Sequence, residues 1–87
     1  MKKLWGDNAW NDYLFFQKEN KKILRKINKL LEDISRNGYK CSGKPEHLSN
    51  ELSDYYSVRI DKKNRIVFKI ENNCIEILQC GSHYKGN

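Results

Sequence analysis

An apolar stripe between Lys21 and Asn37 constrains the fold of this chain more than any other feature of its sequence. The members of the stripe recur at three- and four-residue spacing and are Ile23, Leu24, Ile27, Leu30, Leu31 and Ile34. This spacing predicts an amphipathic helix that packs one broad face on a sheet. Asn20 is a suitable N-cap, and Gly38 tolerates the left-handed backbone that ends many helices, so both ends of the helix are predicted as well.

A shorter helix is expected just before this one. Lys3-Leu4-Trp5 is a candidate for a short strand, and Gly6 and Asp7 provide a helix start directly after it. The apolar side chains predicted to face the core are Trp10, Tyr13, Leu14 and Phe16. The polar side chains predicted to face solvent are Asn11, Asp12, Gln17 and Lys18. Because almost no linker separates the two helices, we expect them to form a helical hairpin.

The second half of the chain predicts the sheet. Apolar and polar residues alternate with a period of two over residues 56–60, 66–70 and 75–77. The short spacing between these strands favours an antiparallel meander. A three-residue loop ending at Asn64 would pair Ile60 with Ile66, and Asn64 would take a left-handed conformation there. Arg59 and Arg65 would then share the face of the sheet that is turned away from the helices.

These elements together predict an α+β fold in the order β-α-α-β-β-β. The helical hairpin is expected to pack on one face of a twisted, mainly antiparallel sheet whose other face stays partly open. A chain of 87 residues has room for one core, so residues 1–87 are expected to form a single domain. Between Tyr39 and Leu52 the periodicity stops, and Ser42-Gly43-Lys44-Pro45-Glu46 has the composition of a surface loop.

The charge of the chain points to its partners. Seventeen Lys and Arg against eleven Asp and Glu give a formal net charge of +6, which fits a polyanionic partner or simply a soluble basic surface. The outer face of the long helix carries like-charged pairs one turn apart, namely Lys21 with Arg25, Lys22 with Lys26, and Arg25 with Lys29. This face is either an ordinary solvated surface or a second binding surface, where an acidic partner or an RNA backbone relieves the repulsion.

Cysteine usage indicates a reducing compartment. Cys41, Cys74 and Cys80 are odd in number, and no apolar signal-peptide run precedes them, so we expect a cytoplasmic protein with no membrane partner. Cys74 and Cys80 would stand roughly 20 Å apart in one strand, too far for a disulfide. No two of the cysteines have the short spacing of zinc ligands. We therefore expect buried, small apolar side chains and neither a metal nor another cofactor.

Some polar side chains of the chain have the chemistry for RNA cleavage without a metal, and these are Glu46, Arg59, Arg65, His83 and Tyr84. The reaction needs a base for the ribose 2′-hydroxyl, a cation for the charge on the phosphate, and an acid for the leaving 5′-oxygen. Glu46 and His83 could be base and acid, and Arg65 could bind the phosphate. Tyr84 could stack on a base or hydrogen-bond the phosphate. Taken singly, each also has an ordinary interpretation, such as an inert terminal histidine or a surface ion pair.

The whole chain resembles the YoeB-type toxins of the RelE superfamily, over nearly all residues and without an evident gap. The segments that carry the resemblance are Leu4-Trp5, Trp10-Asn11-Asp12-Tyr13-Leu14, Lys26-Ile27-Asn28, Gly43-Lys44-Pro45-Glu46, Leu52-Ser53, Arg65-Ile66-Val67 and His83-Tyr84. The resemblance implies a RelE-like fold and a ribosome-dependent endoribonuclease, the toxin of a type II toxin–antitoxin pair. Such a toxin cleaves messenger RNA in the ribosomal A site, through attack of the 2′-hydroxyl on the adjacent phosphate, without a metal.

The resemblance also implies roles and partners. The glutamate at the position of Glu46 is the general base, the arginine at Arg65 stabilises the phosphate, and the histidine at His83 is the general acid. Tyr84 completes the catalytic set, and Lys44 and Arg59 are expected RNA contacts. The implied partners are messenger RNA, the ribosome with its RNA, and a cognate acidic antitoxin that wraps the toxin, while a homodimer stays open.

Two positions depart from the family pattern. His83-Tyr84 commonly ends such chains, whereas Lys85-Gly86-Asn87 follow here, and Ser49 stands where a lysine is expected.

Two alternatives to a nuclease also remain. One is a non-catalytic basic module that binds nucleic acid or a partner protein. The other is a toxin on the same scaffold that poisons a topoisomerase, since a fold does not determine a function.

Overall fold

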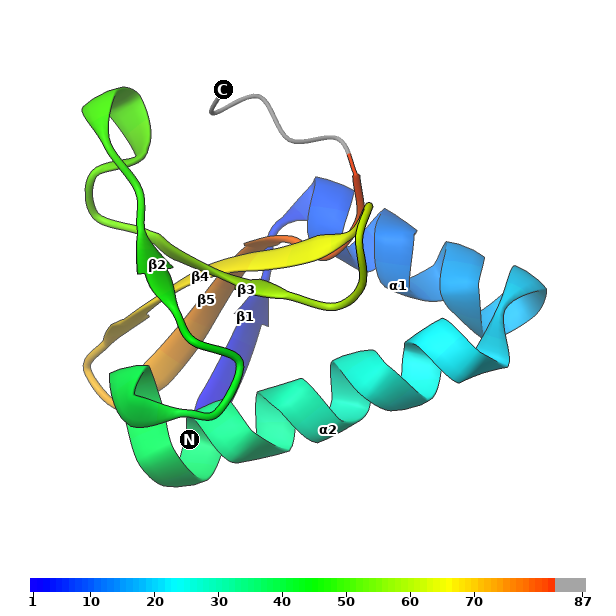
Figure 1. Cartoon of the computed structure of the whole chain (residues 1–87), viewed down its shortest axis with the longest axis horizontal. Helices are drawn as coiled ribbons and strands as arrows, with labels where there is room; N and C mark the ends of the chain where they lie inside the picture. The colour runs from blue at the N-terminus through cyan, green and yellow to red at the C-terminus, as the bar shows by residue number, and fades with distance from the viewer. Residues whose placement is uncertain (83–87) are drawn as a thin grey trace.

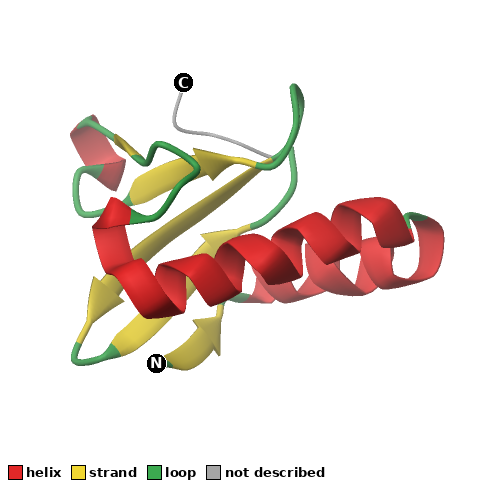
Figure 2. Cartoon of the chain, turned by 60° about the horizontal axis from the view of Figure 1, so that its bottom comes forward, coloured by secondary structure: helices red, strands yellow, loops and turns green. Residues whose placement is uncertain are grey.

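The computed structural model describes residues 1–82, and within them two long helices lie on one face of a five-stranded sheet (Figures 1 and 2). The strands are β1 (Lys2–Trp5), β2 (Glu46–His47), β3 (Tyr56–Arg59), β4 (Arg65–Glu71) and β5 (Cys74–Gln79). The helices are α1 (Asp7–Glu19) and α2 (Lys21–Asn37), and short 3-10 turns span Gly38–Lys40 and Asn50–Leu52. No helix in this part of the chain has the length and apolarity needed to cross a membrane.

The sheet has the strand order β1-β5-β4-β3-β2. β1 runs parallel to β5, and every other pairing is antiparallel. The predicted order β-α-α-β-β-β and the helical hairpin are thus confirmed. The structure adds β2 at one edge, inside the segment predicted as a surface loop. A two-residue strand has no measurable alternation, so the sequence pattern could not indicate it.

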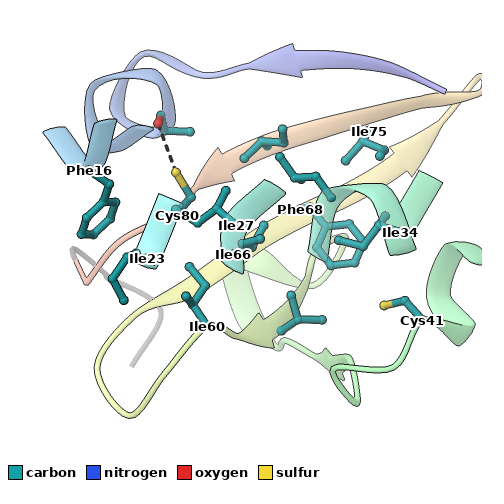
Figure 3. Packing of buried hydrophobic residues seen from close by; sticks show 14 residues of the cluster. Phe16, Ile23, Ile27, Ile34, Cys41, Ile60, Ile66, Phe68, Ile75 and Cys80 are labelled. Carbon is teal, nitrogen blue, oxygen red and sulfur yellow. Dashed lines mark hydrogen bonds between the residues drawn. The ribbon is translucent and has the colours of Figure 1, made fainter. Parts of the chain in front are cut away.

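The prediction for α2 is confirmed at both ends and along its apolar face. The Asn20 side chain accepts a hydrogen bond from the Ile23 amide at 3.2 Å, and Gly38 ends the helix with a φ of +60°. The buried residues of α2 are Ile23, Ile27, Leu31 and Ile34. They pack against buried side chains of the sheet such as Ile66 and Phe68 (Figure 3). This apolar contact holds the helical layer on the sheet.

The predicted apolar face of α1 is partly wrong. Trp10 and Leu14 are 44% and 42% exposed, whereas Ala9, Asp12 and Phe16 are the buried residues of the helix. The helical period is right but its phase is shifted toward Asp12, because that carboxylate accepts a hydrogen bond from the Cys80 amide at 3.3 Å. A buried carboxylate is tolerated where hydrogen bonds compensate its lost hydration.

The predicted register between β3 and β4 is wrong by two residues. Ile66 pairs with Val58 instead of Ile60, and Arg59 lies directly opposite Arg65. Since side chains alternate with a period of two, this shift leaves each residue on its predicted face of the sheet. The two arginines therefore share one face, as the pattern indicated.

The loop between these strands is closed by Asp61 and not by a left-handed Asn64. The Asp61 carboxylate accepts hydrogen bonds from the amides of Lys63 and Asn64 at 2.9 and 2.7 Å. This is a side-chain-closed turn, which gives the backbone an alternative to a left-handed residue. The left-handed residues of the meander are Asn72 and Asn73, in the turn between β4 and β5.

Candidate active site

A groove of about 490 Å³ brings together the candidate residues Lys44, Glu46, Arg59 and Arg65. Gly43 and Pro45 complete its lining. The groove therefore combines the segment before β2, β2 itself, the end of β3 and the start of β4. His83 and Tyr84, the other two candidate residues, lie outside the residues that the structure describes.

Strand pairing positions Glu46 and Arg65. Glu46 pairs with Ser57 across the β2–β3 ladder, and Arg65 pairs with Arg59 across the β3–β4 ladder. The two side chains thus meet over β3, with Oε1 of Glu46 3.7 Å from Nη1 of Arg65. The same Nη1 atom donates a hydrogen bond to Oγ of Ser57 at 3.4 Å. Ser57 is buried, so its hydroxyl holds the guanidinium from beneath.

Sequence patterns alone did not single out Ser57. It was one of the polar residues that alternate along its predicted strand. Its burial on the same face as Arg65 is the feature that gives it a role, because a buried hydroxyl requires a hydrogen-bond partner. The sequence signal that could have indicated Ser57 is a polar residue on the open face of an interior strand, next to the strand that carries Arg65.

The groove is cationic. Arg59 and Arg65 stand directly opposite each other in the antiparallel ladder, a pairing that like charges disfavour. Lys44 adds a third cation, whereas Glu46 is the carboxylate among the lining residues. A bound anion such as a phosphate would relieve the repulsion between the arginines, and each guanidinium can hold a phosphate through two hydrogen bonds.

The backbone before Glu46 has a specialised conformation. Lys44 adopts a φ of +52°, which is uncommon for a residue with a side chain. At Gly43, an added Cβ atom would lie 3.1 Å from Cβ of Val58, so only glycine fits this close approach to β3 without displacement. Pro45 then limits the next φ angle. Local geometry thus directs the Glu46 side chain toward the groove.

A second concavity of about 300 Å³ shares Arg59 with the groove. On the side of α2 it is lined by Lys26, Lys29 and Asp33. Its remaining lining residues are Leu30, Ser42 and Ile60. Cations on one face of α2 are thus connected through Arg59 to the cations of the groove.

Cys41 and Cys80 belong to the core and not to the groove. Burial raises the pKa of the Cys80 thiol to about 12, and the negative charge of Asp12 acts in the same direction. Burial also raises the pKa of Cys41. The Cys80 thiol donates to the carbonyl oxygen of Ala9 at 3.3 Å (Figure 3, dashed line). Such thiols are poor nucleophiles, and the prediction of small core side chains is confirmed for these two residues.

Cys74 is partly exposed, and all three cysteines are free. A candidate metal site requires several ligands close together. Over residues 1–82, no group of three or more His, Cys, Asp and Glu side chains is placed to hold a metal ion. The groove instead offers guanidinium, ammonium and carboxylate groups, which suit phosphate binding and proton transfer.

The chain is similar over nearly its whole length to bacterial toxins. Residues 5–84 match the family described as YoeB-like toxin of bacterial type II toxin-antitoxin system. Toxin YoeB of Escherichia coli K12 is 38% identical over 84 residues, which cover 97% of this chain and 100% of that protein. Toxin YoeB of Synechocystis is 40% identical over 85 residues, which cover 98% of this chain and 99% of that protein.

Solved structures agree with this similarity. A chain of a YoeB-YefM complex from Staphylococcus aureus superposes with a TM-score of 0.91 at 42% identity, covering 97% of this chain and 98% of that chain. A YoeB dimer from the same species gives a TM-score of 0.88 at 41% identity, with the same coverage. The DinJ-YafQ complex from Escherichia coli gives 0.78 at 15% identity, covering 94% and 92%, a likeness that concerns the fold alone.

Proposed function

Because this chain belongs to the YoeB-like toxins of bacterial type II toxin–antitoxin systems, we propose that it is a ribosome-dependent, metal-independent endoribonuclease that cleaves messenger RNA in the ribosomal A site. The observation that carries the proposal is the 3.7 Å approach of the Glu46 carboxylate to the Arg65 guanidinium in a cationic groove. A base next to a phosphate-binding cation is the minimal arrangement for this chemistry.

The reaction starts at the ribose 2′-hydroxyl. Glu46 removes its proton while the 2′-oxygen attacks the adjacent phosphorus, and Arg65 stabilises the negative charge that grows on the non-bridging oxygens. The bond from phosphorus to the 5′-oxygen then breaks, and His83 donates a proton to that oxygen. The products are a 2′,3′-cyclic phosphate and a 5′-hydroxyl. Tyr84 completes the site by stacking on a base or by hydrogen-bonding the phosphate.

The remaining cations hold the RNA. Lys44 and Arg59 line the same groove and bind flanking phosphates. Arg59 also borders the second concavity, so the phosphate path continues over it toward Lys26 and Lys29 on α2. This path gives a function to Lys26 and Lys29 of the basic helix face that the sequence indicated, and to part of the net charge of +6.

The partners follow from the family. The relative from Staphylococcus aureus is described as a YoeB-YefM complex, and a second structure from that species as a YoeB dimer. We therefore propose that this protein acts in the cytoplasm, that an acidic antitoxin silences it, and that it forms a homodimer. An acidic chain complements the cationic groove, which is the surface that cleavage requires.

Mapping of RNA ends tests this function. Messenger RNA on programmed ribosomes should be cut at the A-site codon, leaving a 5′-hydroxyl, and the same RNA without ribosomes should stay largely intact. The His83→Gln variant should lose the cut. A protein that binds programmed ribosomes and leaves the messenger intact would instead be the non-catalytic module, and full cleavage by His83→Gln would exclude the general-acid role.

A further inference from the structure

One carboxylate outside the groove holds the segment that leads into it. Asp33, in the second half of α2, is partly buried. Its Oδ2 atom accepts a hydrogen bond from the Ser42 amide at 2.8 Å and another from the Ser42 hydroxyl. Its Oδ1 atom accepts a hydrogen bond from the Asn37 side chain at 2.6 Å. Hydrogen bonds to a charged carboxylate are among the stronger ones in proteins, so two of them attach Ser42 to α2 although the contact lies at the surface.

Ser42 directly precedes residues 43–46, which form one wall of the groove. The next residue, Gly43, sits against Val58 and Leu30 so closely that a Cβ atom would lie 3.1 Å from Val58. Two consecutive residues are thus held from two sides, one by hydrogen bonds to α2 and one by packing on β3. The next residue along the chain is Lys44, which has a positive φ. An unfavourable conformation of this kind persists only where the surrounding structure determines it.

The Glu46 side chain has little support of its own. It is 70% exposed, and the ion pair that orients it spans 3.7 Å at the surface. Its strand, β2, contributes two residues to the ladder with β3. Exposed ion pairs contribute little to positioning, because water competes for both charges. The position of the carboxylate therefore depends on the path of the backbone that precedes it.

We propose that Asp33 is a positioning residue for RNA cleavage: by holding Ser42 on α2, it fixes the backbone that places Lys44 and Glu46 in the groove. The inference rests on the proposed nuclease function. The inference assigns a role to a residue outside the groove, because Asp33 acts on the groove indirectly, through Ser42 and the backbone that follows. A misplacement of about 1 Å at a general base costs up to about 100-fold in rate, even when its cause is remote from the chemistry.

Asp33 also borders the second concavity beside Lys26 and Lys29, so its charge alone could influence RNA binding. The Asp33→Asn variant separates charge from position. Its amide oxygen can still accept from Ser42, and its amide nitrogen can donate to the Asn37 side-chain oxygen after that amide turns over. Asp33→Ala removes both the charge and the hydrogen bonds. If Asp33 acts by positioning the backbone, only the alanine variant should lose activity. If Asp33 acts through its charge, both variants should lose activity alike.

The test compares these variants in single-turnover cleavage on saturating programmed ribosomes. Asp33→Ala should lose about 10- to 100-fold in the cleavage rate, with a smaller loss of ribosome affinity because Lys44 is displaced as well, and Asp33→Asn should stay within about threefold of the parent. Glu32→Ala is the matched control, because it removes a neighbouring charge that pairs with Arg36 on the same helix. It should cleave at the parental rate. Thermal unfolding and circular dichroism verify that each variant is folded at the assay temperature.

Amide hydrogen exchange gives a readout that does not require cleavage. The Ser42 amide donates to Asp33, and the Leu48 amide donates to the carbonyl of Tyr55 at 3.0 Å beside the β2–β3 ladder. Asp33→Ala should speed exchange at both amides at least about tenfold, whereas Glu32→Ala should leave them unchanged. This measurement tests the positioning of the backbone by Asp33 even if the parental protein does not cut RNA. Absence of cleavage by the parent would refute the proposed nuclease function and not the structural role of Asp33.

Several results would overturn the inference. One is a parental cleavage rate in a folded Asp33→Ala protein. A second is an equal loss in Asp33→Ala and Asp33→Asn, which would assign the effect to charge. A third is a change in ribosome affinity alone, which would make Asp33 part of the binding surface. A fourth is unchanged exchange at the Leu48 amide in Asp33→Ala, because β2 would then keep its place without the contact to α2.

Discussion

Arg65 and Glu46 meet across strand β3, with Nη1 of the arginine 3.7 Å from Oε1 of the glutamate. The two residues lie on strands β4 and β2, which are not neighbours in the sheet, and the side chains bridge the strand between them. The arginine is the better supported of the two, because Ser57 beneath it accepts a hydrogen bond. The pair therefore consists of an arginine that is hydrogen-bonded from beneath and a largely exposed carboxylate in front of it.

This asymmetry predicts how substitutions of Arg65 behave. Arg65→Ala should reduce single-turnover cleavage at least about 100-fold, because the charge on the phosphate loses its stabilising group. Arg65→Lys should recover only part of the rate, since an ammonium cannot hold Ser57 and a phosphate in the same plane. Arg36→Ala, at an exposed arginine of α2 that pairs with Glu32, is the control and should cleave normally. Near-parental cleavage by Arg65→Ala would remove Arg65 from the mechanism.

Because Arg59 connects the groove to Lys26 and Lys29 on α2, binding to ribosomes that carry messenger RNA should depend on these two lysines. Lys26→Glu with Lys29→Glu should weaken binding to ribosomes carrying messenger RNA and reduce the salt dependence of binding, because fewer counterions are released. The rate at saturating ribosomes should change little. Lys21→Glu with Lys22→Glu, in the first turn of the same helix and outside the second concavity, makes an equal change of charge as the control. Equal effects of the two double variants would indicate that overall charge matters and the path does not.

Thiol chemistry tests the packing of the core. Cys74 is partly exposed, whereas Cys41 and Cys80 are buried and have raised thiol pKa values. A thiol-specific reagent at about pH 8 should therefore modify one cysteine quickly in the folded protein and all three after denaturation. Cys74→Ser should remove the fast reaction. Rapid modification of Cys80 in the folded protein would contradict its burial between α1 and β5.

The hydrogen bonds to Asp33 predict a pH dependence of stability. The hydrogen bonds from Ser42 and then from Asn37 lower the pKa of the Asp33 carboxyl below its ordinary value. A carboxyl whose folded-state pKa is depressed contributes stability above its unfolded pKa of about 3.9 and loses that contribution as the pH falls through the folded-state pKa. The advantage of the parent over Asp33→Asn in the free energy of unfolding should therefore be constant near neutral pH and shrink below about pH 4.

Urea unfolding from about pH 7 to about pH 3 measures this difference. Glu32→Gln serves as a comparison, because its exposed ion pair with Arg36 should contribute little at any pH in this range. An advantage of the parent that grows as the pH falls would contradict the assigned direction of the shift.

Particular residues show why some of this fold could be predicted and some could not. Asn20, Gly38 and the apolar stripe between them are local signals, so α2 was predicted with both of its ends. The phase of α1 depends on a contact between Asp12 and the Cys80 amide, which are distant in sequence, and local periodicity cannot contain it. The predicted register of β3 and β4 failed for a different reason: Asp61 closes the loop through hydrogen bonds to the amides of Lys63 and Asn64, which the alternation of apolar and polar residues does not reveal.

The candidate site divides in the same way. The period of two in the strands placed Arg59 and Arg65 on one face, and the structure has them there. The position of Glu46 beside Arg65 could not be derived from alternation, because it depends on Ser42 held by Asp33 and on Gly43 packed on β3. The catalytic roles of these residues and of His83 and Tyr84 stay predictions.

The role of Glu46 as the general base is tested most directly by the single-turnover cleavage rate of the Glu46→Gln variant on saturating programmed ribosomes. Glutamine keeps the size and exposure of the side chain but cannot accept a proton, so the variant should fold and bind ribosomes like the parent. We expect an A-site cleavage rate at least about 100-fold below the parental rate, with unchanged affinity. A parental rate in this variant would contradict the assignment of Glu46 as the general base and, with it, the proposed site.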